Sequence, residues 1–267
     1  MTSSATRAAV TKRARRVAVV AVRTVMLGAA RVVARVVDPG PIAIWLMRGA
    51  RNPAEASARV LPEIDALIPP EPANVVANYL RGGVLLGLPG RQDVRFHYRW
   101  DPERGVIDEQ SKRIPKRIRT IERRLGFDVR YDHDFEAVLE ATRREDTWIT
   151  DEIKAAYLRL HELGFASSIA VYQGDELVGG LWGIEVGSSF GLLSVFHRVD
   201  HAGSMALIAM VNQVGDGLRW QLVDVGLVRP SFERFGAHAV PVDEFVGRVL
   251  AGLASDGPEH SRSVTGS

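Results

Sequence analysis

The sequence predicts an α/β protein (α+β in arrangement) in which a mixed sheet carries helices on both faces. Its second half alternates a helix, a meander of three strands, another helix, one strand and a closing helix, and this order favours such a sheet. The meander strands, expected at residues 167–173, 176–186 and 189–196, are separated by Gly174-Asp175 and Gly187-Ser188. Glycine next to a small polar residue is typical of the tight turns that join antiparallel strands.

The helices around the meander have recognisable ends. Residues 147–164 contain Thr150 as a predicted N-cap, acidic residues in the next turn, and Gly164 where the helix should stop. After the meander, residues 204–218 carry an apolar stripe that predicts a helix packed on the sheet. Residues 242–253 form the closing helix.

The remaining elements are shorter. Residues 220–226 are largely apolar and suit a buried strand, and residues 127–132 predict another strand before a helix at 135–144. Upstream, residues 74–83 predict a helix that ends at paired glycines, and residues 94–100 alternate like a strand.

Proline-rich stretches at 38–41 and 69–72 mark boundaries, because proline interrupts helices. The chain is therefore expected to have four parts. They are a basic amphipathic N-terminal extension (1–50), a small N-terminal domain (51–110), the α/β domain (111–254) and a polar tail (255–267).

The net charge of +2 conceals an uneven distribution. Residues 1–50 carry nine basic groups and one acid, so the other 217 residues sum to −6. A second basic element, residues 110–124, holds seven basic side chains and one acid, and it is expected to be helical. Such patches attract phosphate-bearing partners, either nucleic acid or anionic lipid.

Residues 12–37 predict a basic amphipathic helix, with most of its cations within about a third of a turn. Arginines interrupt its apolar run, so the segment is too short and too charged to span a bilayer. It can pack on the rest of the protein or lie on a membrane surface, and a transit peptide is a third alternative. The oligomeric state is left open.

The chain has no cysteine, which excludes disulfides, thiolate metal sites and cysteine nucleophiles. No Cys/His cluster and no Walker-type phosphate loop is present in the sequence. No metal and no cofactor is therefore expected, and the composition fits a cytoplasmic protein that is either free or bound peripherally to a membrane.

Several motifs are more specific than these patterns. They are Thr147 to Thr150 (T-W-I-T), Ala156 to Gly164 (A-Y-L-R-L-H-E-L-G), Glu176 to Gly183 (E-L-V-G-G-L-W-G), "RWDPERGVI" at 99–107, and "FGAHAVP" at 235–241. In this combination the chain resembles bacterial leucyl/phenylalanyl-tRNA–protein transferases from about residue 75 to 250. The resemblance implies a small N-terminal domain, a GNAT-like acyltransferase domain, and transfer of an aminoacyl group from tRNA to the α-amine of a protein.

The chain also departs from that family at three polar positions. The family's glutamate in F-G-E-S-M-F-S-R aligns with Leu193, the glutamine of its D-C-Q with Gly226, and a lysine with Ser204. The matching Ser194, Phe196, Arg198 and Asp224 are retained. Without the glutamate, a positively charged acceptor loses its evident counter-charge, so we expect an acceptor other than the usual basic N-terminus.

Two residues are candidates for catalysis. Asp224, at the end of a buried-looking strand, could hold or deprotonate the acceptor amine, or it could cap a following turn. Ser194 could donate a hydrogen bond to the ester carbonyl, although a serine in a strand is more often structural.

Further residues are candidates for binding. An apolar pocket for an amino-acid side chain, or ordinary core packing, is expected of Trp148, Phe190, Phe196 and Trp182. By the resemblance, Trp100 would stack on the terminal adenine and Arg198 would meet a phosphate or the terminal adenosine. The candidates for contacts with the tRNA backbone are Lys112, Arg113, Lys116, Arg117 and Arg119.

The favoured function is an aminoacyl-tRNA-dependent aminoacyltransferase that moves leucine, phenylalanine or methionine to an amine. The acceptor would be a protein N-terminus, a peptide or a small molecule. Two alternatives stand beside it: an acyl-CoA-dependent N-acyltransferase, and a non-catalytic relative that binds tRNA or membrane through its basic elements.

Overall fold

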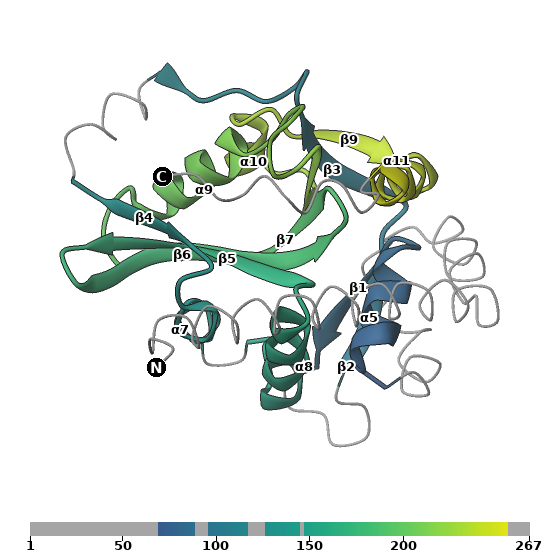
Figure 1. Cartoon of the computed structure of the whole chain (residues 1–267), viewed down its shortest axis with the longest axis horizontal. Coiled ribbons are helices and arrows are strands. Elements are labelled where there is room, and N and C mark those ends of the chain that lie inside the picture. The colour runs from purple at the N-terminus through teal and green to yellow at the C-terminus, as the bar shows by residue number, and fades with distance from the viewer. Residues whose placement is uncertain (1–68, 89–95, 117–125, 145–146, 256–267) are drawn as a thin grey trace, which may run out of the picture.

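A computed structural model describes residues 69–88, 96–116, 126–144 and 147–255 of the chain (Figure 1). The predicted basic extension, the first part of the predicted small N-terminal domain, Arg117, Arg119 and nearly all of the polar tail lie outside these residues. No helix among the described residues is long and apolar enough to cross a membrane.

The described chain folds around one large sheet. Its strands are β3 (Glu103–Asp108), β4 (Asp128–Tyr131), β5 (Ala166–Gln173), β6 (Glu176–Val186), β7 (Ser189–His197), β8 (Leu222–Gly226) and β9 (His238–Pro241). Their order in space is β4-β5-β6-β7-β8-β3-β9. The β7–β8 pair is parallel and the other neighbouring pairs are antiparallel, so the prediction of a mixed sheet is confirmed.

Helices cover both faces of this sheet (Figure 1). They are α5 (Pro72–Tyr79), α7 (Phe135–Ala141), α8 (Asp151–Glu162), α9 (Ala202–Asn212), α10 (Pro230–Glu233) and α11 (Val242–Ser255). Helices α7 and α8 pack on one face in a core that includes Trp182, and the other core lies between α9 and the opposite face. Because β5, β6 and β7 are covered on both sides, their sequences are apolar almost throughout rather than alternating.

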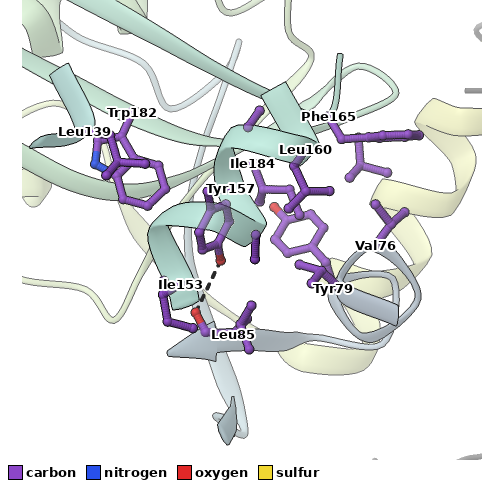
Figure 2. Packing of buried hydrophobic residues seen from close by; sticks show 14 of the residues in the cluster. Val76, Tyr79, Leu85, Leu139, Ile153, Tyr157, Leu160, Phe165, Trp182 and Ile184 are labelled. Atoms are coloured by element: carbon purple, nitrogen blue, oxygen red, sulfur yellow. Dashed lines mark hydrogen bonds between the residues drawn. The ribbon is translucent and has the colours of Figure 1, made fainter. Parts of the chain in front are cut away.

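A second, small sheet lies beside the main one. After α5 ends at Tyr79, the chain turns at Gly82, whose φ of +90° is a conformation that favours glycine. It then enters β1 (Gly83–Gly87), which pairs with β2 (Phe96–Trp100). The Tyr157 hydroxyl of α8 donates a 3.2 Å hydrogen bond to the Leu85 carbonyl, which ties this hairpin to the core (Figure 2).

Most elements predicted from the pattern are present. Thr150 caps α8 through a bond from the Ile153 amide, and Gly164 follows the helix with a φ of +76°. Strands β1, β3 and β9 and helix α10 were not predicted. The described part of the second basic element is residues 110–116. Residues 112–115 are not helical, contrary to the prediction, since Pro115 disfavours a helix in the residue before it, whereas Lys116 is helical and residues 117–124 lie outside the described residues.

The close contact between β6 and β7 at Gly183 predicts that a larger side chain there would destabilise the fold. A Cβ at this position would overlap the carbonyl oxygen of Gly191, whereas a Cβ at the exposed helical Gly247 meets nothing within 4 Å. We expect Gly183→Ala to lower the free energy of unfolding by about 3 kcal/mol. We expect Gly247→Ala to raise it by about 0.5–1 kcal/mol, because alanine favours a helix over glycine. Urea denaturation measures both, and equal midpoints for the two variants would contradict this packing.

Candidate functional site

The parallel pairing of β7 and β8 stops early. It runs from Ser189–Leu222 to Gly191–Asp224, whereas β7 continues to His197. Among the described strands, the rest of β7 pairs only with β6. We call the diverging ends, residues 191–197 of β7 and residues 224–226 of β8, the β7–β8 fork. Backbone groups of β7 that face β8 beyond Gly191 therefore have no strand partner there.

Two positions where the sequence departs from the family it resembles lie at this fork. Leu193 and Gly226 each lie two residues beyond the last pair, Gly191 and Asp224, on strands that run parallel. A bulge in β7 places Ser194 opposite Trp182 and Leu192 opposite Gly183, so Leu193 is the extra residue. Leu193 packs against the core that contains Trp182.

Asp224 lies at the base of the fork in a buried ion pair. Its side chain is 2% exposed and that of Arg104, on the neighbouring β3, is 1% exposed. Arg104 donates to Asp224 Oδ1 from Nε at 3.1 Å and to Oδ2 from Nη2. The Tyr79 hydroxyl donates to Oδ2 at 3.3 Å, and the Gly226 amide donates to Oδ1 at 2.8 Å. Each carboxylate oxygen therefore accepts two hydrogen bonds, which is the usual number for an ionised carboxylate.

The electrostatics of this cluster keep the pair charged. Burial alone would lower the pKa of Arg104, but the attraction of the Asp224 carboxylate outweighs it, and the pKa is raised. Burial and then the Asp224 charge raise the pKa of Tyr79 well above its usual value, so Tyr79 is a neutral hydrogen-bond donor. The bond from the Gly226 amide matches the turn-capping alternative for Asp224. With its lone pairs occupied, Asp224 has no site left for an ammonium proton in this conformation.

The predicted apolar pocket residues do not form one group. Trp182, Phe196 and half-buried Trp148 belong to the core beneath α7 and α8, where the Trp148 and Trp182 rings are 5.9 Å apart. Trp182 is fully buried and donates to Thr142 Oγ1 at 2.9 Å. Phe190 lies in the core on the opposite face and stacks on Trp220 at 4.4 Å. Phe190 is thus separated by the sheet from the other three.

Trp100 is 1% exposed, and its ring lies where a Cβ on Gly83 would be. No face of this ring is open to an adenine in this conformation, so stacking there would require the hairpin to move. Ser194, by contrast, is only partly buried and shares the face of Asp224.

The basic residues that were predicted to contact tRNA lie at separate places around the sheet. Arg198, at the exposed end of β7, donates to the Leu177 carbonyl at 2.8 Å. Lys112 donates to the Val214 carbonyl, and Arg113 donates to the Glu233 carbonyl at 2.8 Å. Both side chains thus hold the first residues of the second basic element against the rest of the fold, and Lys116 is exposed. No group of three or more metal-binding side chains occurs within the described residues.

Sequence reasoning missed three polar residues at the fork: Tyr79, Arg104 and Arg99. Arg104 belongs to the "RWDPERGVI" motif, so the motif was noticed but its arginine was not given a role. Tyr79 lies at the end of a helix, and the sequence around it does not indicate a functional role. Arg99, on β2, reaches the fork from a separate sheet, as described below.

Comparison with known proteins gives a consistent result. The family described as "Leucyl/phenylalanyl-tRNA protein transferase" matches residues 106–250. A leucyl/phenylalanyl-tRNA–protein transferase of Rubrobacter xylanophilus is 36% identical over 187 residues, which cover 69% of this chain and 96% of that protein. The one of Phenylobacterium zucineum is 36% identical (65% and 80% covered), and that of Paramagnetospirillum magneticum is 32% identical (69% and 90% covered).

The buried ion pair predicts a large effect on stability. Asp224→Asn leaves the Arg104 guanidinium buried without a counter-charge and should lower the free energy of unfolding by about 3–5 kcal/mol. Tyr79→Phe removes one neutral donor and should cost about 1 kcal/mol. Urea denaturation at pH 7 measures both. An Asp224→Asn midpoint equal to that of wild type would contradict the ion pair.

Proposed function

The chain belongs to the leucyl/phenylalanyl-tRNA–protein transferase family and is an aminoacyltransferase, and we propose that it transfers an amino acid from aminoacyl-tRNA to an amine acceptor. One observation carries this proposal. The family match, residues 106–250, spans both sides of the β7–β8 fork and all the strands from β4 to β9. The similarity therefore lies in the part of the protein where the reaction would occur.

The reaction requires alignment more than strong acid–base chemistry. The acceptor nitrogen attacks the ester carbonyl carbon, the bond to the ribose oxygen breaks, and a proton passes from the amine to the departing oxygen. An aminoacyl ester is already activated, so no covalent enzyme intermediate is needed. Holding ester and amine together contributes several kcal/mol to the lowering of the barrier.

We assign the chemical roles to the fork. The Ser194 hydroxyl and the backbone amides of β7 that face away from β6 would stabilise the developing oxyanion. Asp224, with its bonds filled by Arg104, Tyr79 and Gly226, would hold the end of β8 in place and not take the proton directly. Asp224 is thus a positioning residue in this proposal.

Binding of the tRNA would use the basic side chains. Arg198, next to the end of β7, and Lys116 are both exposed and would contact phosphates. From the sequence alone, Arg117 and Arg119 are proposed to do the same. We propose Trp148 as the aromatic side chain nearest to a pocket for the amino acid, because it is the partly buried member of its cluster. Trp100 would contact the adenosine only after the hairpin moves.

We propose the predicted division into domains with one change. Strand β3 (Glu103–Asp108) pairs with β8 and β9 in the main sheet, so the catalytic domain would begin at about residue 103 and not at residue 111. The extension, residues 1–50, would add affinity for phosphate-bearing partners. Its amphipathic segment, residues 12–37, is proposed to touch the surface of an anionic membrane, which would hold a cytoplasmic enzyme there.

A transfer assay tests the proposed function. The full chain is incubated with tRNA charged with labelled leucine, phenylalanine or methionine and with a mixture of amines and peptides. We expect label in an amide product, and we expect Ser194→Ala to lower kcat by about 100-fold, the loss of one oxyanion donor. Ser231→Ala, an exposed serine on α10, is the matched control and should leave kcat unchanged.

Two results would contradict the proposal. The first is that no charged tRNA donates its amino acid to any acceptor. The second is that the protein binds acetyl-CoA in calorimetry and acylates an amine with it, which would favour the acyl-CoA alternative. Asp224→Ala is a poor test, because the buried ion pair makes loss of folding and loss of catalysis hard to separate.

The basic extension makes a separate prediction. Residues 1–37 should strengthen binding to tRNA and to liposomes containing anionic lipid, and both affinities should fall as salt rises, because counterions are released on binding. Fluorescence titration compares the full chain with residues 38–267, at salt concentrations from about 50 to 200 mM. A salt-independent affinity, or no difference between the two chains, would remove this role from the extension.

A further inference from the structure

Arg99 reaches the fork from the small sheet. It lies on β2, opposite Val84 of β1, yet its Nη2 would be 3.5 Å from a Cβ placed on Gly226 at the end of β8. The side chain is 30% exposed, so one part of the guanidinium is available to solvent. Arg99 thus lies next to the position that a side chain at residue 226 would occupy.

A carboxylate holds one edge of this guanidinium. Arg99 Nε donates to Asp101 Oδ2 at 2.8 Å, and the Asp101 side chain is only 9% exposed. An arginine has five N–H donors in a rigid planar arrangement. With Nε bound to Asp101, Nη2 lies next to Gly226, and a guanidinium group is suited to bind a planar anion such as a carboxylate.

Apart from Asp101, which is bound to Arg99 Nε, the fork as defined above has one acid, Asp224. Leu193, on the β7 side of the fork, is apolar and packs against the core that contains Trp182. Asp224, the acid on the same strand as Gly226, is neutralised by Arg104 and fully hydrogen-bonded. A basic acceptor would therefore find a guanidinium and a leucine, but an acidic acceptor would find a donor of opposite charge.

We propose that Arg99 determines acceptor specificity and that the acceptor carries a carboxylate close to its reacting amine, as a peptide with N-terminal aspartate or glutamate does. This inference rests on the proposed function and names its acceptor class. The carboxylate binds the terminal nitrogens of Arg99, and this contact places the α-amine at the fork beside Ser194.

Three peptides that differ only in the first residue test the inference. Aspartate, asparagine and lysine have different charges at that position, and asparagine matches aspartate in size. With charged tRNA as donor, kcat/KM for the aspartate peptide should exceed that for the asparagine peptide about tenfold or more, the effect of a charge-assisted hydrogen bond. The lysine peptide should be the poorest acceptor.

Variants show whether Arg99 causes the preference. Arg99→Gln should reduce the ratio between aspartate and asparagine peptides to about one, and Arg99→Lys should retain part of it, since the charge remains but the planar donors are lost. Leu193→Glu should shift the preference toward the lysine peptide. The matched control is Arg130→Gln on β4, where Nε donates to Asp128 Oδ2 at 2.6 Å in a similar pair remote from the fork. It should leave the ratio as in wild type.

The outcomes separate this inference from the proposed function. Transfer to all three peptides at equal rates, a preference for lysine, or a ratio that survives Arg99→Gln in a variant with a wild-type melting temperature would overturn the inference alone. Absence of transfer to all three peptides while another amine in the transfer assay is labelled would overturn the inference alone. Absence of transfer to every acceptor would overturn the proposed function and the inference together.

Discussion

The buried ion pair between Arg104 and Asp224 is the interaction on which the fork depends. Two charges inside a core are stable only when the surrounding groups satisfy nearly all of their hydrogen bonds. Here those groups are the Tyr79 hydroxyl at the end of α5, the Gly82 carbonyl that precedes β1, and the Gly226 amide of β8. The Phe245 ring of α11 also lies 5.1 Å from the guanidinium carbon. Besides the bond between Tyr157 and the Leu85 carbonyl, the small N-terminal part and the main sheet are thus joined at this point. That point is also the place where β7 and β8 begin to separate.

This arrangement bears on how the site can tolerate the loss of ionisable residues. A catalytic triad would lose most of its activity if any one member were removed. A fork that aligns an ester and an amine depends mainly on the positions of its strands. The strands are held by the ion pair on the β8 side and by the ladder with β6 on the β7 side. In the proposed mechanism, leucine at 193 and glycine at 226 would therefore change which acceptor the fork binds more than its ability to hold an activated ester.

The sequence predicted the main sheet well and the surroundings of the fork poorly. Strands β5, β6 and β7 and helices α8 and α9 have strong local signals: apolar runs, an N-cap at Thr150 and glycine turns. Strands β3 and β9 were missed because "ERGVID" and "HAVP" are short and contain polar residues that local patterns place in loops. Asp224 was a candidate from the sequence, but its partners Tyr79 and Arg104 are 145 and 120 positions away. No local pattern shows a contact over such separations.

The replacement of a glutamine by Gly226 is more than the loss of a side chain. Gly226 has a φ of +73°, a region that glycine enters freely and glutamine rarely does, and in this conformation its amide donates to Asp224 Oδ1. A glutamine here would have to force the backbone into another conformation, which would remove that bond or strain the turn. The glycine, the turn and the occupied Asp224 carboxylate are thus parts of one arrangement. In it, the aspartate supports the end of β8, and the positively charged group nearest to the vacated side-chain position is Arg99 from another sheet. Restoring only the glutamine would therefore not restore the polar site of the related transferases, because Arg99 and the turn would both have to move.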